Sequence, residues 1–468
     1  MRQADEPCKN RIALAAAFPQ HPPMLARVLS AAVNGIEAFP VEVEVNSGWG
    51  DTIVVILSCI LPMRDFTAVQ CPDHAFLGTA SRRHEFRRPA PILQLLKWAA
   101  RRVIPLALIG IPCFYSYAGD GYGVPHADDP GPPLKDSYLA AKKELGTSIM
   151  PMGMGDAAYM QLLLHHFSLI IPDYGMYMSD LQPKRGQWSF DSTDQIMNFA
   201  KTNSLKVRGH VLVYDYPMRR HEEKWTPTPN WVYAGKYSRA DMVQIMCEHI
   251  DRVMKRYQDS VSQWIVVNEA VGNALPGEME DNIWRRTIGE DYVELAFIHA
   301  HQVAPNAELL INDYGADYLG QSSCGPFKVN NFYRYVRKLR QKGIPIDGVG
   351  LQFHLTVGLD HPNLASIEDN FARYRALGVK VYITELDVKI KEPVTEDKLG
   401  AQAALYGLVM NAALNSPNCS GLSVWGYTDR YSWITTFHAF AGYTNACLFD
   451  SELNPKKGVL SLLHAGNN

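Results

Sequence analysis

The stretch VYITELDV, residues 381–388, reads as a buried strand, yet it carries two carboxylates, Glu385 and Asp387. Seven similar β-rich runs recur from residue 134 onward, separated by helical stretches: SIMPMG, SLIIPD, LKVRGHVLVY, SQWIVVNEA, AELLINDY, DGVGLQFH and GLSVWGY. Several runs are continuously apolar, as parallel strands covered on both faces are, and the segments between them are long enough for crossover helices. Eight such units predict an α/β fold, the (β/α)₈ TIM barrel. A doubly wound sheet is the main alternative, although no GxGxxG turn opens the first unit.

The composition of the chain excludes several classes of function. It has 468 residues, 47% of them hydrophobic, which is enough to bury a large core. Its 45 basic and 48 acidic residues give a net charge of -3, so no electrostatic footprint for nucleic acid or an anionic membrane is expected. The eight cysteines include no CxxC pair. We therefore predict no disulfide framework, no metal and no cofactor, and nothing implies a protein partner.

Residues 1–130 lack the regular succession of β-rich runs seen from residue 134 onward. They are predicted to be an N-terminal extension, whose fold the sequence does not specify. The chain begins MRQADEPCKN, which lacks the apolar region of a signal peptide. Two arginines precede an apolar, signal-like or anchor-like run at 103–118, which is short for a membrane-spanning helix. Three interpretations stay open: an internal signal or anchor, a misassigned start codon, or a core segment of a small domain. If the run is an internal signal, the protein is predicted to be secreted or extracytoplasmic. If the run is an anchor, the protein is predicted to be held at a membrane.

Two further segments place the domain boundary. Residues 24–56 resemble the opening of the magnesium-chelatase-like ATPases, but no GxxxxGK[ST] phosphate loop follows, so nucleotide hydrolysis is not predicted. The segment GDGYGVPHADDPGPPLKDSY, residues 119–138, is rich in Gly, Pro and Asp and reads as a linker. We therefore predict a boundary near residue 130 and a catalytic barrel over 131–468.

Polar side chains stand where the predicted strands end, and in a barrel such positions face one mouth. They are Asn268 and Glu269 on the fourth strand, Gln352 and His354 on the sixth, Glu385 and Asp387 on the seventh, and Trp425 after the eighth. Each acid alone could be a strand-end cap or a structural ion pair, because a buried carboxylate needs a partner. Two glutamates on facing strands are what glycoside hydrolysis requires: one protonates the leaving oxygen, and the other attacks the anomeric carbon or activates water.

Two motifs resemble glycoside hydrolase family 10, the retaining endo-β-1,4-xylanases. GVKVYITELDV at 378–388 fits the nucleophile motif of that family, and WIVVNEA at 264–270 fits its acid/base motif apart from Ile265. Further matches follow in order along the chain: RGHVLVY, IGEDYVELAF, LLINDY, GIPIDGVGLQFH, SVWGYTDRYSW and LFDSELNPK. The resemblance spans residues 134–465 and implies a TIM barrel that hydrolyses xylan.

The resemblance also implies a role for each matching residue. Glu269 would be the general acid/base and Glu385 the nucleophile, while His354 and Asp387 would keep Glu385 oriented and ionised. Asn268 would bond the 2-hydroxyl of the sugar, and Gln352 would lie beside the acid/base. The predicted substrate-binding residues are His210, Trp425, Trp433, Tyr177, Tyr214 and Asp215.

Two departures from the family pattern bear on the substrate. Where the family has ENxMKW, this chain has DYGMYM at 173–178, which removes a Lys and an Asn and adds two tyrosines. Where the family has Trp-His, it has Tyr214 and Asp215, and the added acid is expected to raise the pKa of a neighbouring Glu. Two alternatives to a xylanase therefore stay open: a retaining β-glycosidase of the same fold acting on a different β-glycoside, and a barrel that binds carbohydrate without cleaving it.

Overall fold

The computed structural model describes residues 27–28, 41–46, 52–57, 132–216, 226–320 and 322–456. The chain divides into two compact units, residues 1–119 and 120–468. In the first, β1 (Arg27–Val28), β2 (Val41–Asn46) and β3 (Thr52–Leu57) form an antiparallel sheet in that order. The apolar run 103–118 and the segment predicted as a linker up to residue 131 lie outside the described residues. Within the described ranges, no helix has the length and apolar character needed to cross a bilayer.

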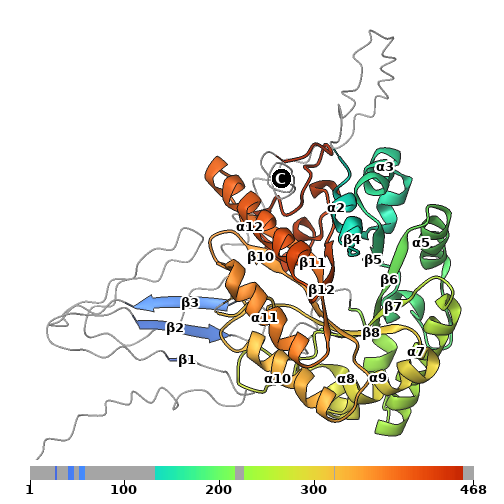
Figure 1. Cartoon of the computed structure of the whole chain (residues 1–468). Helices are drawn as coiled ribbons and strands as arrows, with labels where there is room; N and C mark the ends of the chain where they lie inside the picture. Colours follow the sequence, from blue (N-terminus) through green and yellow to red (C-terminus); the bar gives the residue numbers. More distant parts are fainter. Residues whose placement is uncertain are drawn as a thin grey trace, which may run out of the picture. The chain divides into compact units, whose positions relative to one another are not determined.

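The second unit is a closed barrel of parallel strands (Figure 1). Its strands in spatial order are β4 (Glu144–Ile149), β5 (Leu169–Pro172), β6 (Lys206–Val213), β7 (Gln263–Asn268), β8 (Glu308–Asp313), β9 (Gly348–Leu351), β11 (Lys380–Lys391) and β12 (Cys419–Val424). Pairing of β12 with β4 closes the circle. The predicted TIM barrel is confirmed, and all eight predicted runs contribute a strand.

Helices surround the barrel on its outside (Figure 1). They are α2 (Leu134–Ala140), α3 (Ala157–His166), α4 (Met178–Leu181), α5 (Asp191–Thr202), α6 (Asn230–Ala234), α7 (Arg239–Tyr257), α8 (Ile283–Ile288), α9 (Tyr292–Val303), α10 (Lys328–Gln341), α11 (Leu364–Ala376) and α12 (Glu396–Asn415). Short 3₁₀ helices lie at Pro151–Gly155, Asp429–Tyr431, Trp433–Thr435 and His438–Phe440. Capping boxes at Ser238 and Asn363 fix the start of α7 and α11, because each satisfies backbone N–H groups that the first turn leaves free.

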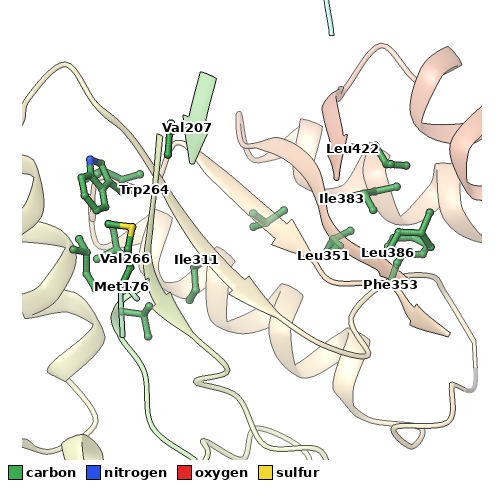
Figure 2. Packing of buried hydrophobic residues seen from close by; sticks show 14 of the residues in the cluster. Met176, Val207, Trp264, Val266, Ile311, Leu351, Phe353, Ile383, Leu386 and Leu422 are labelled. Carbon is green, nitrogen blue, oxygen red and sulfur yellow. The ribbon is translucent and has the colours of Figure 1, made fainter. Parts of the chain in front are cut away.

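Two hydrophobic clusters lie on opposite faces of the strands. In β7, Trp264 and Val266 belong to the large cluster shared with the helices, whereas Ile265 belongs to a smaller one. Figure 2 shows part of the large cluster, with side chains from successive strands such as Trp264, Ile311 and Ile383. Gly209 of β6 lies so close to Trp264 that a Cβ would overlap the indole ring. Where the strands are regular, the alternation of their side chains thus separates the outer packing layer from the barrel interior.

Strand β11 is longer than the predicted run, and this length explains how it holds two acids. Its first half pairs with β9 and β12, while its second half pairs with two short strands, β10 (His354–Thr356) and β13 (Tyr443–Thr444). Glu385 and Asp387 therefore follow Ile383, the last residue of β11 paired with β9, where β10 becomes the neighbour and polar side chains of adjoining segments reach the two carboxylates.

Candidate active site

A cavity of about 970 Å³ opens among the segments that follow the C-terminal ends of the strands. Of the residues predicted for the site, those that line it are Glu269, Glu385, His354, Asn268, Gln352, His210, Trp425, Trp433, Tyr177 and Tyr214. Asp387 lies directly behind this wall, in contact with His354. The structure thus brings together eleven of the twelve predicted residues from six different strands or strand-end loops.

Glu269 follows the last residue of β7 and has a left-handed backbone, with φ of 53°. This conformation is uncommon for a residue with a side chain, and it turns the carboxyl group into the cavity. The amides of Asn268 and Gln352 reach its Oε1 at 3.4 and 3.3 Å, and the hydroxyl of Tyr214 donates to its Oε2 at 3.0 Å. Burial, reinforced by the charges of Asp313 and Glu385, raises the pKa of Glu269 to about 7. A carboxyl group with this pKa can both donate and accept a proton near neutral pH.

Glu385 is 4% exposed and is held by donors at both oxygens. Asn312 donates to Oε1 at 2.6 Å, and the Nε2 of His354 lies 3.2 Å from Oε2. The other ring nitrogen of His354 lies 2.8 Å from Asp387, which also accepts from the Trp433 indole at 2.8 Å. Although burial opposes its charge, the two carboxylates raise the pKa of His354 to about 10. His354 is therefore a cation at neutral pH, and its Nε2–H donates to Oε2 of Glu385.

Asn312 connects the two glutamates and was not among the predicted residues. Besides Glu385, its amide donates to Asn268 at 2.7 Å, and its oxygen accepts from Thr384 at 2.6 Å. Gly350 on the adjacent strand leaves room for the Asn312 side chain, because a Cβ there would overlap it. The rule that selected the other residues, a polar side chain at a strand end, applies equally to Asn312 within LLINDY.

A fully buried ion pair behind Glu269 was also missed. Asp313 and Lys328 lie 2.8 Å apart, and neither side chain is exposed. Asp313 also accepts from the backbone N–H of Val271 at 3.1 Å, so it fixes the chain that follows Glu269. The pair links the end of β8 to α10, two segments whose proximity the sequence pattern does not specify.

Aromatic rings form most of the remaining wall. Trp425 packs edge to face against His210, with ring centroids 5.1 Å apart, and burial lowers the pKa of His210 so that it stays neutral. On the side of β5, Tyr174 and Tyr177 replace the polar family residues, and their rings lie 6.0 Å apart. Beside them Asp173 is 5% exposed, and burial followed by the charge of Glu385 raises its pKa to about 8. Flat apolar faces mixed with few polar groups suit the binding of sugar rings.

Asp215 is the predicted substrate-binding residue that the structure places elsewhere. It does not line the cavity, and 1% of its surface is exposed. Its carboxylate accepts from the hydroxyl of Tyr233 and, at 3.1 Å, from the backbone N–H of Ile283. The structure therefore does not bring Asp215 into the cavity with the other predicted residues, and its contact with the sugar stays a prediction. The raised pKa of Glu269 has burial as its main cause, followed by Asp313 and Glu385.

A (β/α)₈ barrel with two enclosed glutamates in an aromatic-lined mouth defines a glycoside hydrolase. The model of glycosyl hydrolase family 10 matches residues 133–465, and the chain belongs to that family. It is similar to endo-1,4-beta-xylanase B of Thermotoga neapolitana, with 32% identity over 64% of this chain and 80% of the relative. Endo-1,4-beta-xylanase D of Talaromyces funiculosus is 33% identical over 69% of this chain and 75% of the relative.

Solved structures give the same result for the fold. Xylanase 10B of Thermotoga petrophila, crystallised with xylobiose, superposes with a TM-score of 0.64 at 28% identity, over 74% of this chain and 98% of that one. Native xylanase 10B of Thermotoga maritima superposes with a TM-score of 0.63 at 29% identity, over 71% and 98%. The resemblance seen in the sequence motifs is thus confirmed at the level of the family and the barrel.

Proposed function

We propose that the chain is an endo-β-1,4-xylanase that cleaves xylan with retention of anomeric configuration. Its family, and the xylanase names of the relatives described above, support the substrate. The observation that carries the mechanism is the electrostatic contrast between the two glutamates. Glu269 has a pKa raised to about 7, whereas Glu385 lies against a histidine that is positively charged at neutral pH.

The proposed reaction has two steps. In the first, ionised Glu385 attacks the anomeric carbon while protonated Glu269 transfers its proton to the departing glycosidic oxygen, so a glycosyl ester forms and the aglycone leaves neutral. In the second, ionised Glu269 takes a proton from water, which attacks the same carbon and releases Glu385. We assign to Asn268 the hydrogen bond to the 2-hydroxyl of the reacting sugar, a contact that would strengthen in the oxocarbenium-like transition state.

Product analysis tests this proposal. Proton NMR of a xylo-oligosaccharide digest is expected to show the β-anomer of the reducing end first, followed by slow mutarotation. Xylan should be shortened to oligosaccharides faster than cellulose oligomers or aryl β-glycosides are cleaved. First appearance of the α-anomer would refute the retaining mechanism, and turnover of another β-glycoside without any action on xylan would refute the substrate.

A pH dependence follows from the state of Glu269. Because the first step needs its proton and its pKa is raised to about 7, kcat/KM should decline above neutral pH, by about tenfold per pH unit well above the pKa. The measurement is a pH series of kcat/KM on a soluble xylo-oligosaccharide. In Glu269→Gln, which cannot ionise, the residual activity should lose this alkaline decline. A decline that persists unchanged in Glu269→Gln would assign it to another group.

The wall formed by Asp173, Tyr174 and Tyr177 favours a second candidate within the same fold. It offers aromatic surface where family members bind xylose hydroxyls with Lys and Asn, so a different β-glycoside is the runner-up substrate. The substrate comparison described above separates the two. A barrel that binds sugar without cleaving it is the remaining alternative. Sugar binding alone does not require an enclosed carboxylic acid opposite an ionised glutamate, so this alternative leaves the pair without a purpose.

We also propose that residues 1–130 are an extension separate from the catalytic barrel at 131–468. The start of the family match at residue 133 and the division into compact units near 119 support a boundary in this region. Because polymeric xylan lies outside cells, we further propose a secreted or extracytoplasmic location, for which the apolar run 103–118 is the candidate signal or anchor.

A further inference from the structure

Tyr214 contacts the oxygen of Glu269 that the other donors leave free. The amides of Asn268 and Gln352 both approach Oε1, whereas the Tyr214 hydroxyl donates to Oε2 at 3.0 Å. Since Oε1 already faces two amide donors, the carboxyl proton belongs on Oε2. Tyr214 is thus bonded to the oxygen from which that proton departs.

Residues 214–216, which follow β6, are held by contacts on three sides. The Thr228 hydroxyl donates to the backbone oxygen of Tyr214 at 2.8 Å. The next residue, Asp215, is anchored to Tyr233 and Ile283, as described above. The phenol ring itself lies between Tyr177 and Tyr216, with centroid distances of 6.2 and 5.6 Å. The contacts of Asp215 thus fix the backbone next to Tyr214, whose phenol reaches Glu269.

We propose that Tyr214 is a positioning residue for Glu269, which orients its carboxyl group and stabilises the carboxylate left after proton transfer, and that Asp215 holds Tyr214 in place for this task. The inference rests on the proposed function in so far as that function makes Glu269 the acid/base. The sequence predicted Tyr214 only as a substrate-binding residue, and the proposal gives it this more specific role.

The strength of this contact should change during the reaction. A hydroxyl donating to a neutral carboxyl makes an ordinary hydrogen bond, whereas the same donor facing a carboxylate makes a charge-assisted bond that is about twice as strong. The bond therefore strengthens as Glu269 releases its proton, and an interaction that grows toward the transition state accelerates the step. Burial raises the pKa of Tyr214 well above its usual value, so the phenol keeps its own proton.

Charged groups on other elements also shift the pKa of Glu269, some upward and some downward. Asp313 of β8 and Glu385 of β11 raise its pKa, and Lys328 of α10 lowers it. The neutral phenol of Tyr314 lies in the same cavity wall. The hydrogen bond from Tyr214 lowers the pKa of Glu269. Removal of the Tyr214 hydroxyl alone should consequently raise this pKa, since the other groups stay in place.

The test is Tyr214→Phe in the full chain, with Asp215→Asn as a second variant. For Tyr214→Phe we expect the alkaline decline of kcat/KM to move up by about one pH unit, the equivalent of one lost charge-assisted hydrogen bond. On xylo-oligosaccharides, kcat should fall about tenfold with little change in KM. A dinitrophenyl β-xylobioside, whose leaving group needs no proton, should form the glycosyl-enzyme at nearly the wild-type rate. Asp215→Asn should change the same quantities in the same direction, but less.

Tyr314→Phe is the matched control, because Tyr314 lines the same cavity but donates to Asn273 at 3.3 Å. Its alkaline decline should stay at the wild-type pH. A raised KM in Tyr214→Phe on both substrates, with the decline unmoved, would overturn the proposal and assign Tyr214 to the sugar. Glu269→Gln is measured in parallel: if it keeps the wild-type pH profile, the assignment of Glu269 has failed, and not only the role of Tyr214.

Discussion

Glu385→Ala is expected to reduce the turnover of xylan by roughly 10⁵-fold, because without the carboxylate no glycosyl ester can form and water has no activating group on that face of the sugar. Binding of a xylo-oligosaccharide should stay within about tenfold of wild type, since the aromatic wall and the amides are unchanged. Initial-rate kinetics and calorimetric titration of the same preparation measure the two effects.

A matched control for this variant is Glu368→Ala on the exposed surface of α11, which should leave both turnover and binding as in wild type. The removed carboxylate also leaves space for a small anion. Azide added to Glu385→Ala should therefore restore turnover and yield the α-glycosyl azide. Wild-type turnover by Glu385→Ala would reject the assignment of Glu385 as the nucleophile.

Glu269→Ala should show a loss that depends on the leaving group. On xylo-oligosaccharides the loss is expected to be about 10²- to 10⁴-fold, the usual contribution of general acid–base catalysis. With a dinitrophenyl xylobioside the first step should proceed at nearly the wild-type rate, and the glycosyl-enzyme should accumulate because no base activates water. Pre-steady-state release of dinitrophenolate measures this burst.

External azide gives the complementary result for this variant. It should restore turnover of the dinitrophenyl xylobioside in Glu269→Ala and give the β-glycosyl azide, because azide replaces water in the second step and needs no base. The opposite anomers from the two alanine variants identify which glutamate does which task. An equal loss on both substrates, without a burst, would show that Glu269 is not the acid.

The barrel and most of the site could be predicted from the sequence because the relevant signals are local. Continuous apolar runs indicate buried parallel strands, and a polar residue at the end of such a run faces the mouth whatever its neighbours are. This rule places Glu269, His354 and Glu385 correctly in one cavity. It also explains the acids of VYITELDV, since β11 continues past the barrel wall to Lys391.

The sequence does not reveal contacts between segments that lie far apart along the chain. Asp215 follows a strand end as Glu269 does, yet its carboxylate turns to Tyr233 and Ile283, neither of which the pattern around β6 reveals. The ion pair of Asp313 with Lys328 likewise depends on where α10 packs. The direction of a side chain after a strand depends on such partners. Hydrophobic periodicity therefore predicts the position of a residue in the fold better than its functional role.

The most direct test of the account is to trap the glycosyl-enzyme. A 2-deoxy-2-fluoro-xylobioside with a dinitrophenyl leaving group slows both steps, and the activated leaving group makes the second step slower than the first, so the covalent intermediate should accumulate. Mass spectrometry of the proteolysed enzyme is predicted to find the sugar on the peptide that contains VYITELDV, attached to Glu385. Attachment to any other residue, or continued turnover without a covalent adduct, would contradict the account.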